Sequence, residues 1–298
     1  MKITFFNPYH NGDVNVSRGF VRKIMERAPE HTYKYSHKNP ANLLADIPNL
    51  AYDPIGINSV PNDSVGVFVK DDTTHINTWY CQQNFKFYHK YKITFDSLYC
   101  CFDENCKKVF GFSLSDISKE PKDFYPVIDY SKYDIKEAKR WLEQNQGKKI
   151  LIENGQVLSG QAHDFNMTQV IANVARNNKD TTFILSNHGN VGLPNNCIYS
   201  DKIIQKKTKS DLNEISFLST YCDVIIGKAS GVFSFCLTQQ NLFERQAKYL
   251  CFSKWPTIAE NKFWLHNLMK DRVEYSSKIL VSGEANVDRI ASIIEANI

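Results

Sequence analysis

The apolar positions near the start of the chain predict a short strand followed by a helix. Residues 2–6, KITFF, form an apolar run of the length that a buried strand needs. A polar stretch over residues 7–17 contains a Gly-Asp pair, and apolar residues then recur at helical spacing over residues 19–27. A strand, a polar loop and a helix in this order open a doubly wound fold.

The same order of elements begins again in the middle of the chain. Residues 150–177 read as a strand, a Gly-containing loop and a helix, and residues 113–133 have the polar, Pro-containing character of a linker. A length of 298 residues suits two domains of about 150 residues each. We therefore predict an α/β protein of two Rossmann-like domains, residues 1–130 and 131–298, which face each other across a cleft.

Residues 211–234 predict a turn that could bind a phosphate. A helical pattern leads into the apolar run of residues 222–226, which is typical of a parallel strand covered on both faces. Ser230 and Gly231 then begin another helix, and the backbone N–H groups at a helix N-terminus bind anions. In open α/β sheets, ligands bind beyond the carboxyl ends of the strands. The alternative is that Ser230 and Gly231 form only a tight turn.

Composition and charge are those of an ordinary globular protein, with 42% hydrophobic and 23% charged residues and a net charge of +4. The N-terminus lacks the apolar segment of a signal peptide, and no apolar run approaches the roughly 20 residues that span a membrane. The densest group of lysines is either a solvated surface or an attraction for an anionic partner. Its members are Lys202, Lys206, Lys207 and Lys209.

The eight cysteines point to free thiols. Several lie inside apolar runs, where cysteine acts as a small hydrophobic residue. Cys101 and Cys106 have no matching Cys/His pair downstream, so the spacing predicts no zinc site. Free thiols are typical of a cytoplasmic protein.

Three segments together resemble the GT-B glycosyltransferases, and in particular the heptosyltransferase family of bacterial surface-polysaccharide synthesis. They are ITFFNPYHNGDVNVSRGFVRKI, ILIENGQVLSGQ and LNEISFLSTYCDVIIGKASGVFS. Two positions depart from that family: Ala229 stands where an Asp usually precedes Ser-Gly, and Ser234 where a His is common. The Ser-rich loop is also similar to the nucleotide-binding end of some GT-B fucosyltransferases. Donor recognition is therefore expected to differ from that of a heptosyltransferase.

The resemblance implies transfer of a sugar from a nucleotide-sugar donor to a hydroxyl acceptor, in a glycan or a glycolipid. It assigns a catalytic carboxylate to Asp13 of the Gly-Asp pair, which would act as the general base on a loop after the first strand. The alternative is that Asp13 caps the following helix, with Ser17 as the competing cap. His10 either shares the catalytic work, orients the acceptor or binds phosphate, or is an ordinary surface residue.

The donor is expected to bind the second domain without a cofactor and without an obligatory metal. GT-B enzymes commonly stabilise the leaving diphosphate with helix N-termini and side-chain donors, and no Asp-x-Asp motif lies at a strand end. Glu214 is a candidate for the ribose or a solvated helix residue, and His188, between Asn187 and Gly189, is a candidate for the base pocket. The candidates for the diphosphate are Ser159, Gly160, Gln161, Lys228, Ser230, Gly231 and Ser234.

Other functions are compatible with the same pattern. A sugar-nucleotide epimerase shares the two-domain fold, although it would be longer and richer in carboxylates. The departure at Ala229 leaves open a non-catalytic protein that binds nucleotide sugars or glycans. A viral type of DNA-base glycosyltransferase needs a basic groove that the sequence does not place, so no nucleic-acid partner is expected. The expected partners are a nucleotide sugar and a glycan or lipid-linked acceptor, in the cytoplasm or at the inner face of the membrane.

Overall fold

The structure is a computed structural model that describes residues 1–54, 65–83, 94–157, 160, 162–189, 191–205, 210–254 and 278–298. It contains two compact units, the first running from Met1 to Asp129 and the second beginning at Tyr130. Each is built on its own sheet. No helix among the described residues is long and apolar enough to cross a membrane.

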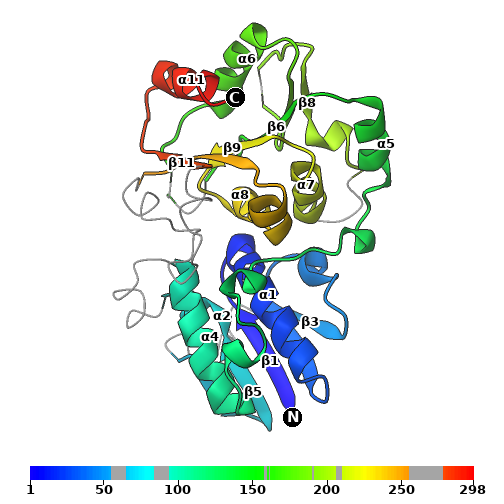
Figure 1. The fold of residues 1–298 in the computed structure, drawn as a ribbon, viewed down its shortest axis with the longest axis vertical. Helices are drawn as coiled ribbons and strands as arrows, with labels where there is room; N and C mark the ends of the chain where they lie inside the picture. Colours follow the sequence, from blue (N-terminus) through cyan, green and yellow to red (C-terminus); the bar gives the residue numbers. More distant parts are fainter. Residues whose placement is uncertain are drawn as a thin grey trace. The chain divides into compact units, whose positions relative to one another are not determined.

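The first unit is a sheet of order β3-β2-β1-β5-β4 with helices packed on it (Figure 1). The strands β1, β2, β3 and β5 are parallel, and β4 pairs antiparallel with β5 at the edge. The bounds are β1 Lys2–Asn7, α1 Asn11–Arg27, β2 Thr32–His37, β3 Leu50–Pro54, β4 Val67–Lys70, β5 Thr73–Asn77, α2 Thr78–Gln83 and α4 Thr94–Phe110. Short 3-10 helices lie at Ala41–Leu44, Leu114–Asp116 and Pro121–Phe124.

The first strand is confirmed, whereas the polar stretch after it is mostly helix. The helix α1 begins at Asn11, well before the expected start at residue 19. Its polar N-terminal turns are partly buried, so their polarity does not mark them as a loop. Further along α1, the ring of Phe20 stacks on Phe102 and Phe124, with ring centroids 4.8 and 5.3 Å apart.

The predicted linker over residues 113–133 is packed into the first unit for most of its length. Phe124 and Tyr125 within it are 0% and 3% exposed. Gly19 of α1 allows this approach, because a Cβ at Gly19 would lie 2.1 Å from the carbonyl oxygen of Phe124. This segment is therefore not a linker along most of its length, because two buried aromatic residues within its polar sequence pack into the first unit.

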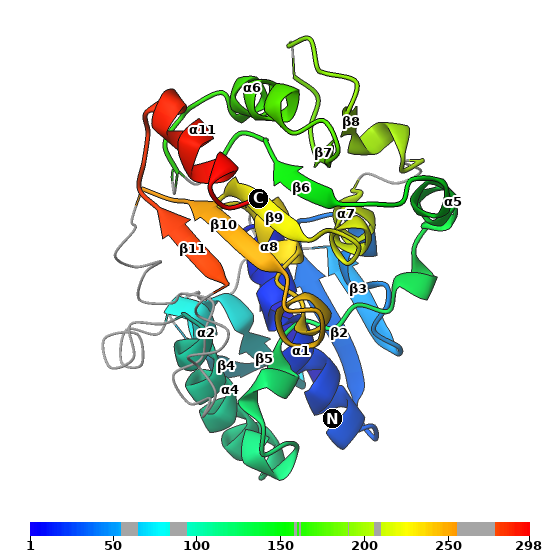
Figure 2. The same ribbon diagram turned by 45° about the horizontal axis from the view of Figure 1, so that its top comes forward.

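The second unit is a parallel sheet of order β11-β10-β9-β6-β7-β8 (Figure 2). In chain order this is the third, second and first strands followed by the fourth, fifth and sixth, read from the β8 edge, which is the Rossmann arrangement. The strands are β6 Lys149–Glu153, β7 Thr182–Leu185, β8 Cys197–Tyr199, β9 Val224–Lys228, β10 Lys248–Phe252 and β11 Ile279–Ser282. The helices are α5 Lys136–Gln144, α6 Met167–Asn177, α7 Leu212–Ser219, α8 Gly231–Phe235 and α11 Val287–Glu295, with a π-turn at Gln240–Glu244 and 3-10 turns at Tyr130–Lys132 and Ser200–Lys202.

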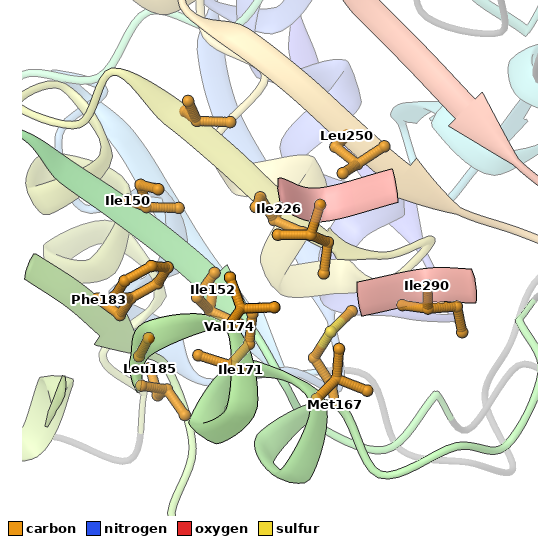
Figure 3. Packing of buried hydrophobic residues seen from close by; sticks show 14 of the residues in the cluster. Ile150, Ile152, Met167, Ile171, Val174, Phe183, Leu185, Ile226, Leu250 and Ile290 are labelled. Atoms are coloured by element: carbon orange, nitrogen blue, oxygen red, sulfur yellow. The ribbon is translucent and has the colours of Figure 1, made fainter. Parts of the chain in front are cut away.

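The core of this unit forms where α6 and α11 cover one face of the sheet (Figures 2 and 3). Alternate residues of the central strands, such as Ile150, Ile152 and Ile226, point into it and are fully buried. From the helices come Ile171 and Ile290. Because the strands are also covered on their other face by α7 and α8 (Figure 2), β6 and β9 are buried along their whole length.

All eight cysteines lie among the described residues, and none of them is in a disulfide bond there. Six are buried, and Cys100 on α4 and Cys197 on β8 are partly exposed.

Candidate functional site

The strand order of the second unit places a topological switch point between β6 and β9. Helical connections leave β6 toward β7 on one side and arrive at β9 from the other, and ligands bind at such a point beyond the carboxyl ends of the strands. Glu153 ends β6 directly opposite Gly227 on β9. The residues after these two ends, Asn154 with Gly155 and Ala229 with Ser230, therefore form the centre of the candidate site.

Glu153 is an ionisable residue at this point, and it is not among the candidates that the sequence suggested. It is 2% exposed. Its Oε1 accepts a hydrogen bond from the backbone N–H of Gly155 at 2.9 Å, and its Oε2 is buried without a hydrogen-bond partner among the described residues. Burial raises the pKa of Glu153 to about 7, against the opposing effects of the Gly155 N–H, the Ser230 hydroxyl and Lys228.

Two glycines make room for this carboxyl group. A Cβ at Gly155 would lie 2.8 Å from the Glu153 Oε1, and a Cβ at Gly227 would lie 2.6 Å from the Glu153 Cβ. Side chains at either position would displace Glu153. An ionisable residue that ends an apolar run, with a glycine two residues later, was the signal that could have identified it.

Lys228 is the last residue of β9 rather than the first of a loop, since the strand is shifted by two residues from the predicted 222–226. Its side chain is 3% exposed, and its Nζ lies 4.8 Å from the centroid of the Phe165 ring. A cation held over an aromatic face is stabilised by the ring quadrupole. The structure therefore places this candidate residue at the switch point, buried against an aromatic ring.

Ser230 and Gly231 begin α8, which is a helix of five residues. The Ser230 Oγ accepts a hydrogen bond from the N–H of Phe233 at 3.2 Å, which is the geometry of an N-cap. The hydroxyl of Ser234 donates to the carbonyl oxygen of Gly231 at 2.9 Å, and Ser234 is 4% exposed. Ser230 and Gly231 thus lie at the switch point, whereas Ser234 turns its hydroxyl into its own helix.

The loop after β7 is fixed to the end of β6 by Asn154. The Asn154 side chain donates to the Oγ1 of Thr168 at 2.8 Å and to the carbonyl oxygen of Asn187 at 2.6 Å, and it accepts from the N–H of Asn187 at 2.8 Å. His188 follows, with its Nε2 bonded to the Asp201 carboxylate and its ring centroid 4.4 Å from that of Tyr199. The candidate base-pocket loop is therefore held by hydrogen bonds at the same edge of the sheet as the end of β6.

The other donor-side candidates have different surroundings. Glu214, in the first turn of α7, is 5% exposed, so it is not a solvated helix residue. Burial raises its pKa, opposed by backbone N–H groups that include that of Asp134. Gly160 has the positive φ of 69° that favours glycine. Ser159 and Gln161 lie outside the described residues.

In the first unit, His10 and Asp13 lie just beyond β1, whose neighbour β5 is on the other side of that sheet's own switch point. Asp13 is in the first turn of α1, so the expectation that it sits on a flexible loop is wrong. Its Oδ2 accepts from the backbone N–H of His10 at 3.3 Å, which makes it part of the helix cap. Burial raises the pKa of Asp13, opposed by the N–H and charge of His10.

Ser17 is not the cap, because it is buried inside α1 and its hydroxyl bonds to Val14 and to the Tyr35 hydroxyl. The Tyr35 hydroxyl also bonds to Thr78 at 2.7 Å, and the side chain of Asn7 donates to Thr78 at 3.3 Å. A fixed polar network therefore surrounds the N-terminal end of α1. The described residues contain no group of three or more His, Cys, Asp or Glu that could hold a metal ion.

Three solved structures that resemble this chain in fold are glycosyltransferases by description. The E. coli ADP-heptose lipopolysaccharide heptosyltransferase II has a TM-score of 0.51 and 12% identity, with 100% of this chain and 98% of that chain covered. The glycosyl transferase family 9 structure from Veillonella parvula has a TM-score of 0.54 and 10% identity over 99% and 91% of the chains. The E. coli heptosyltransferase WaaC with ADP-2-deoxy-2-fluoro heptose has a TM-score of 0.51 and 10% identity over 100% of both. This chain has the GT-B fold.

No family model and no curated protein matches the sequence. The likeness to the GT-B structures therefore rests on the course of the chain, with identities of 10–12%. It confirms the predicted fold class of two Rossmann-like α/β units.

Proposed function

We propose that this protein is a glycosyltransferase that moves a sugar from a nucleotide-sugar donor to a hydroxyl of an acceptor, a glycan or a glycolipid. The observation that carries the proposal is the buried Lys228 beside Ser230 and Gly231 at the switch point of a Rossmann-ordered sheet. The GT-B fold supports it, since WaaC with this fold is solved with ADP-2-deoxy-2-fluoro heptose.

In this proposal the donor binds the second unit. Backbone N–H groups near Ser230 and Gly231 hold the diphosphate, and Lys228 supplies positive charge as the diphosphate leaves. Gly160, with Ser159 and Gln161, completes the phosphate site, and Ser234 supports it by holding the first turn of α8. The loop of His188 takes the base, and the buried Glu214 takes the ribose.

The acceptor is activated by the first unit. Asp13 accepts the proton of the acceptor hydroxyl, the oxygen attacks the anomeric carbon, and the nucleoside diphosphate departs with the electrons of the bond that breaks. Burial favours this role because a raised pKa makes Asp13 a stronger base than an exposed carboxylate. His10, which is exposed at the N-cap of the same helix, orients the acceptor.

The reaction is proposed to run without a cofactor or an obligatory metal, since Lys228 and backbone donors supply the charge stabilisation that a cation would otherwise give. Turnover should then be unchanged by EDTA. A lipid-linked acceptor would bring the protein to the inner face of the membrane, and a glycan acceptor would leave it in the cytoplasm.

The proposal is tested by mixing the purified chain with a panel of nucleotide sugars and measuring the release of nucleoside diphosphate. Release of the diphosphate, stimulated by glycan or glycolipid extracts, supports a transferase. Binding without turnover would instead show a nucleotide-sugar-binding protein, the alternative that Ala229 leaves open. Interconversion of the sugars would show an epimerase. The absence of both binding and turnover would overturn the proposal.

A further inference from the structure

Glu153 connects the two loops that are proposed to hold the donor. Its Oε1 is bonded to the N–H of Gly155 at 2.9 Å, so it fixes the start of the loop after β6. Lys228 and the Ser230 hydroxyl, at the end of β9, are the other groups that stabilise its ionised form. A single carboxyl group thus contacts both sides of the switch point.

The surrounding residues leave a specific space for the Glu153 carboxyl group. Gly155 and Gly227 are the two residues whose missing side chains leave space for it. A charged side chain that is 2% exposed is rare in a protein without a partner charge or a full set of hydrogen bonds. Its Oε2 has no hydrogen-bond partner among the residues that the structure describes, so the ionised form is incompletely compensated.

A donor diphosphate at Ser230 and Gly231 would bring negative charge next to this carboxyl group. Like charges at short distance disfavour the ionised form of a carboxylate, because neither charge is screened by water in a buried site. The bound phosphate would also compete with the carboxylate for Lys228 and for the Ser230 hydroxyl. Both effects act in the same direction and favour a neutral carboxyl group in the complex.

We propose that Glu153 is a positioning residue that joins the two donor loops and takes up one proton from solvent when the nucleotide sugar binds. This inference rests on the proposed function and adds a proton to its binding step. The neutral carboxyl group keeps Gly155 and Ser230 in place while Lys228 turns its charge to the diphosphate.

The groups that face Glu153 leave it free to titrate alone. Lys228 is on β9, Cys251 is on β10 and Cys236 follows α8. Burial raises the pKa of both thiols to about 12, so they are neutral through the physiological range. Glu153, with a pKa of about 7, is therefore the group here that changes charge near neutrality.

The test is calorimetric titration of the full chain with ADP-glucose and UDP-glucose, whose diphosphates carry no proton that titrates near neutrality. We expect affinity to fall by up to about tenfold per pH unit above pH 7, the limit for uptake of one proton. Parallel titrations in HEPES and Tris, which differ in ionisation enthalpy, measure the proton uptake directly. Glu153→Gln should bind the nucleotide sugar with an affinity that does not change as the pH rises above 7.

Two variants separate this role from a merely structural one. Glu143→Gln removes an exposed carboxylate on α5 and should keep the wild-type pH profile. Glu153→Asp keeps an ionisable carboxyl group but shortens the side chain. Its nucleotide-sugar affinity should fall because the two donor loops are held less well, while the pH dependence of binding should persist. If Glu153→Gln does not fold, the proton uptake of the wild type, measured in the two buffers, tests the inference by itself.

Nucleotide-sugar binding with the same affinity at pH 6 and pH 8.5, and with no proton uptake, would overturn this inference and leave the proposed function standing. Absence of binding for every nucleotide sugar at every pH would overturn both. A pH profile that Glu153→Gln does not flatten would assign the proton to another group and overturn the inference as well.

Discussion

Arg18 and Asp46 form an ion pair in which neither side chain is exposed to solvent, with Arg18 Nη1 3.1 Å from Asp46 Oδ1. The other carboxylate oxygen binds Arg22 at 2.5 Å and the backbone N–H of Asp129 at 3.1 Å. One carboxylate thus links α1, the segment after the 3-10 helix Ala41–Leu44 and Asp129, the residue before the second unit begins.

Removal of this carboxylate should strongly destabilise the first unit. Asp46→Ala leaves the charge of Arg18 buried without its partner, and breaking a buried pair in this way costs about 3–5 kcal/mol. The measurement is urea unfolding followed by tryptophan fluorescence. Glu137→Ala is the control, because its pair with Arg140 at 3.0 Å is partly exposed and should contribute less than about 1 kcal/mol. Equal losses for the two variants would contradict the prediction.

Gly19→Ala should destabilise the same unit by overpacking. The new Cβ would lie 2.1 Å from the carbonyl oxygen of Phe124 and 2.6 Å from that of Tyr125, so backbone must move. Overpacking of this kind typically costs about 1–3 kcal/mol, measured as a fall in the urea midpoint. Gly192→Ala, with no neighbour within 4 Å of the new Cβ, should be close to neutral.

Much of the fold was predictable because buried parallel strands are continuous apolar runs. The strand β1 ends one residue after the predicted 2–6, and β6 begins one residue before the predicted start at residue 150. The errors came where polar residues are buried at the ends of elements. The Asn and Asp residues at the start of α1 are typical of a loop, and Lys228 is charged, yet the first lie in a helix and the second is buried in β9.

The same cause explains which site residues the sequence revealed. Ser230 and Gly231 stand out locally, because a Ser-Gly pair after an apolar run is a recognisable turn. Glu153 depends on contacts with residues 74 positions or more away, Gly227 and Ser230 among them, and such contacts follow only from the pairing of β6 with β9. The local pattern offers one sign of it, the glycine two residues after this charged end of an apolar run.

Asp13→Asn should lower the turnover number by about 10²–10⁴-fold, the usual contribution of a general base, and leave the donor affinity nearly unchanged. The amide still accepts the hydrogen bond from the His10 N–H, so the helix cap persists. Because burial raises the pKa of Asp13, wild-type turnover should also fall on acidification at a higher pH than an exposed aspartate would give. Loss of stability with full turnover per folded molecule would show that Asp13 is only a cap.

Gly231→Val should abolish detectable nucleotide-sugar binding. A branched side chain at the first residue of α8 prevents close approach of a phosphate to the backbone. Isothermal titration with the donor that turns over is the measurement, after circular dichroism has shown that the variant is folded. Gly192→Val, on a loop with open space around it, is the matched control. Unchanged affinity in folded Gly231→Val would place the diphosphate elsewhere.

Glu153 should make the stability of the free protein depend on pH. Its pKa in the folded chain, about 7, lies above the ordinary value of 4.5, so the folded state holds the proton more tightly than the unfolded state. This contribution is fully present below the unfolded pKa and is lost as the pH rises through the folded pKa. Between about pH 4 and pH 8, Glu153→Gln should therefore gain roughly 2–3 kcal/mol in unfolding free energy relative to the wild type. Parallel stability profiles for the two proteins would contradict this.

The unequal burial of the cysteines provides a way to follow the two units in solution. Cys100 on α4 and Cys197 on β8 are the partly exposed thiols, one in each unit, and the other six are shielded. Burial raises the pKa of Cys197 to about 11, so maleimide dyes should react with it more readily at alkaline pH. A donor and an acceptor dye on the natural sequence would then report, by energy transfer, whether a nucleotide sugar changes the distance between the units, without a single introduced cysteine.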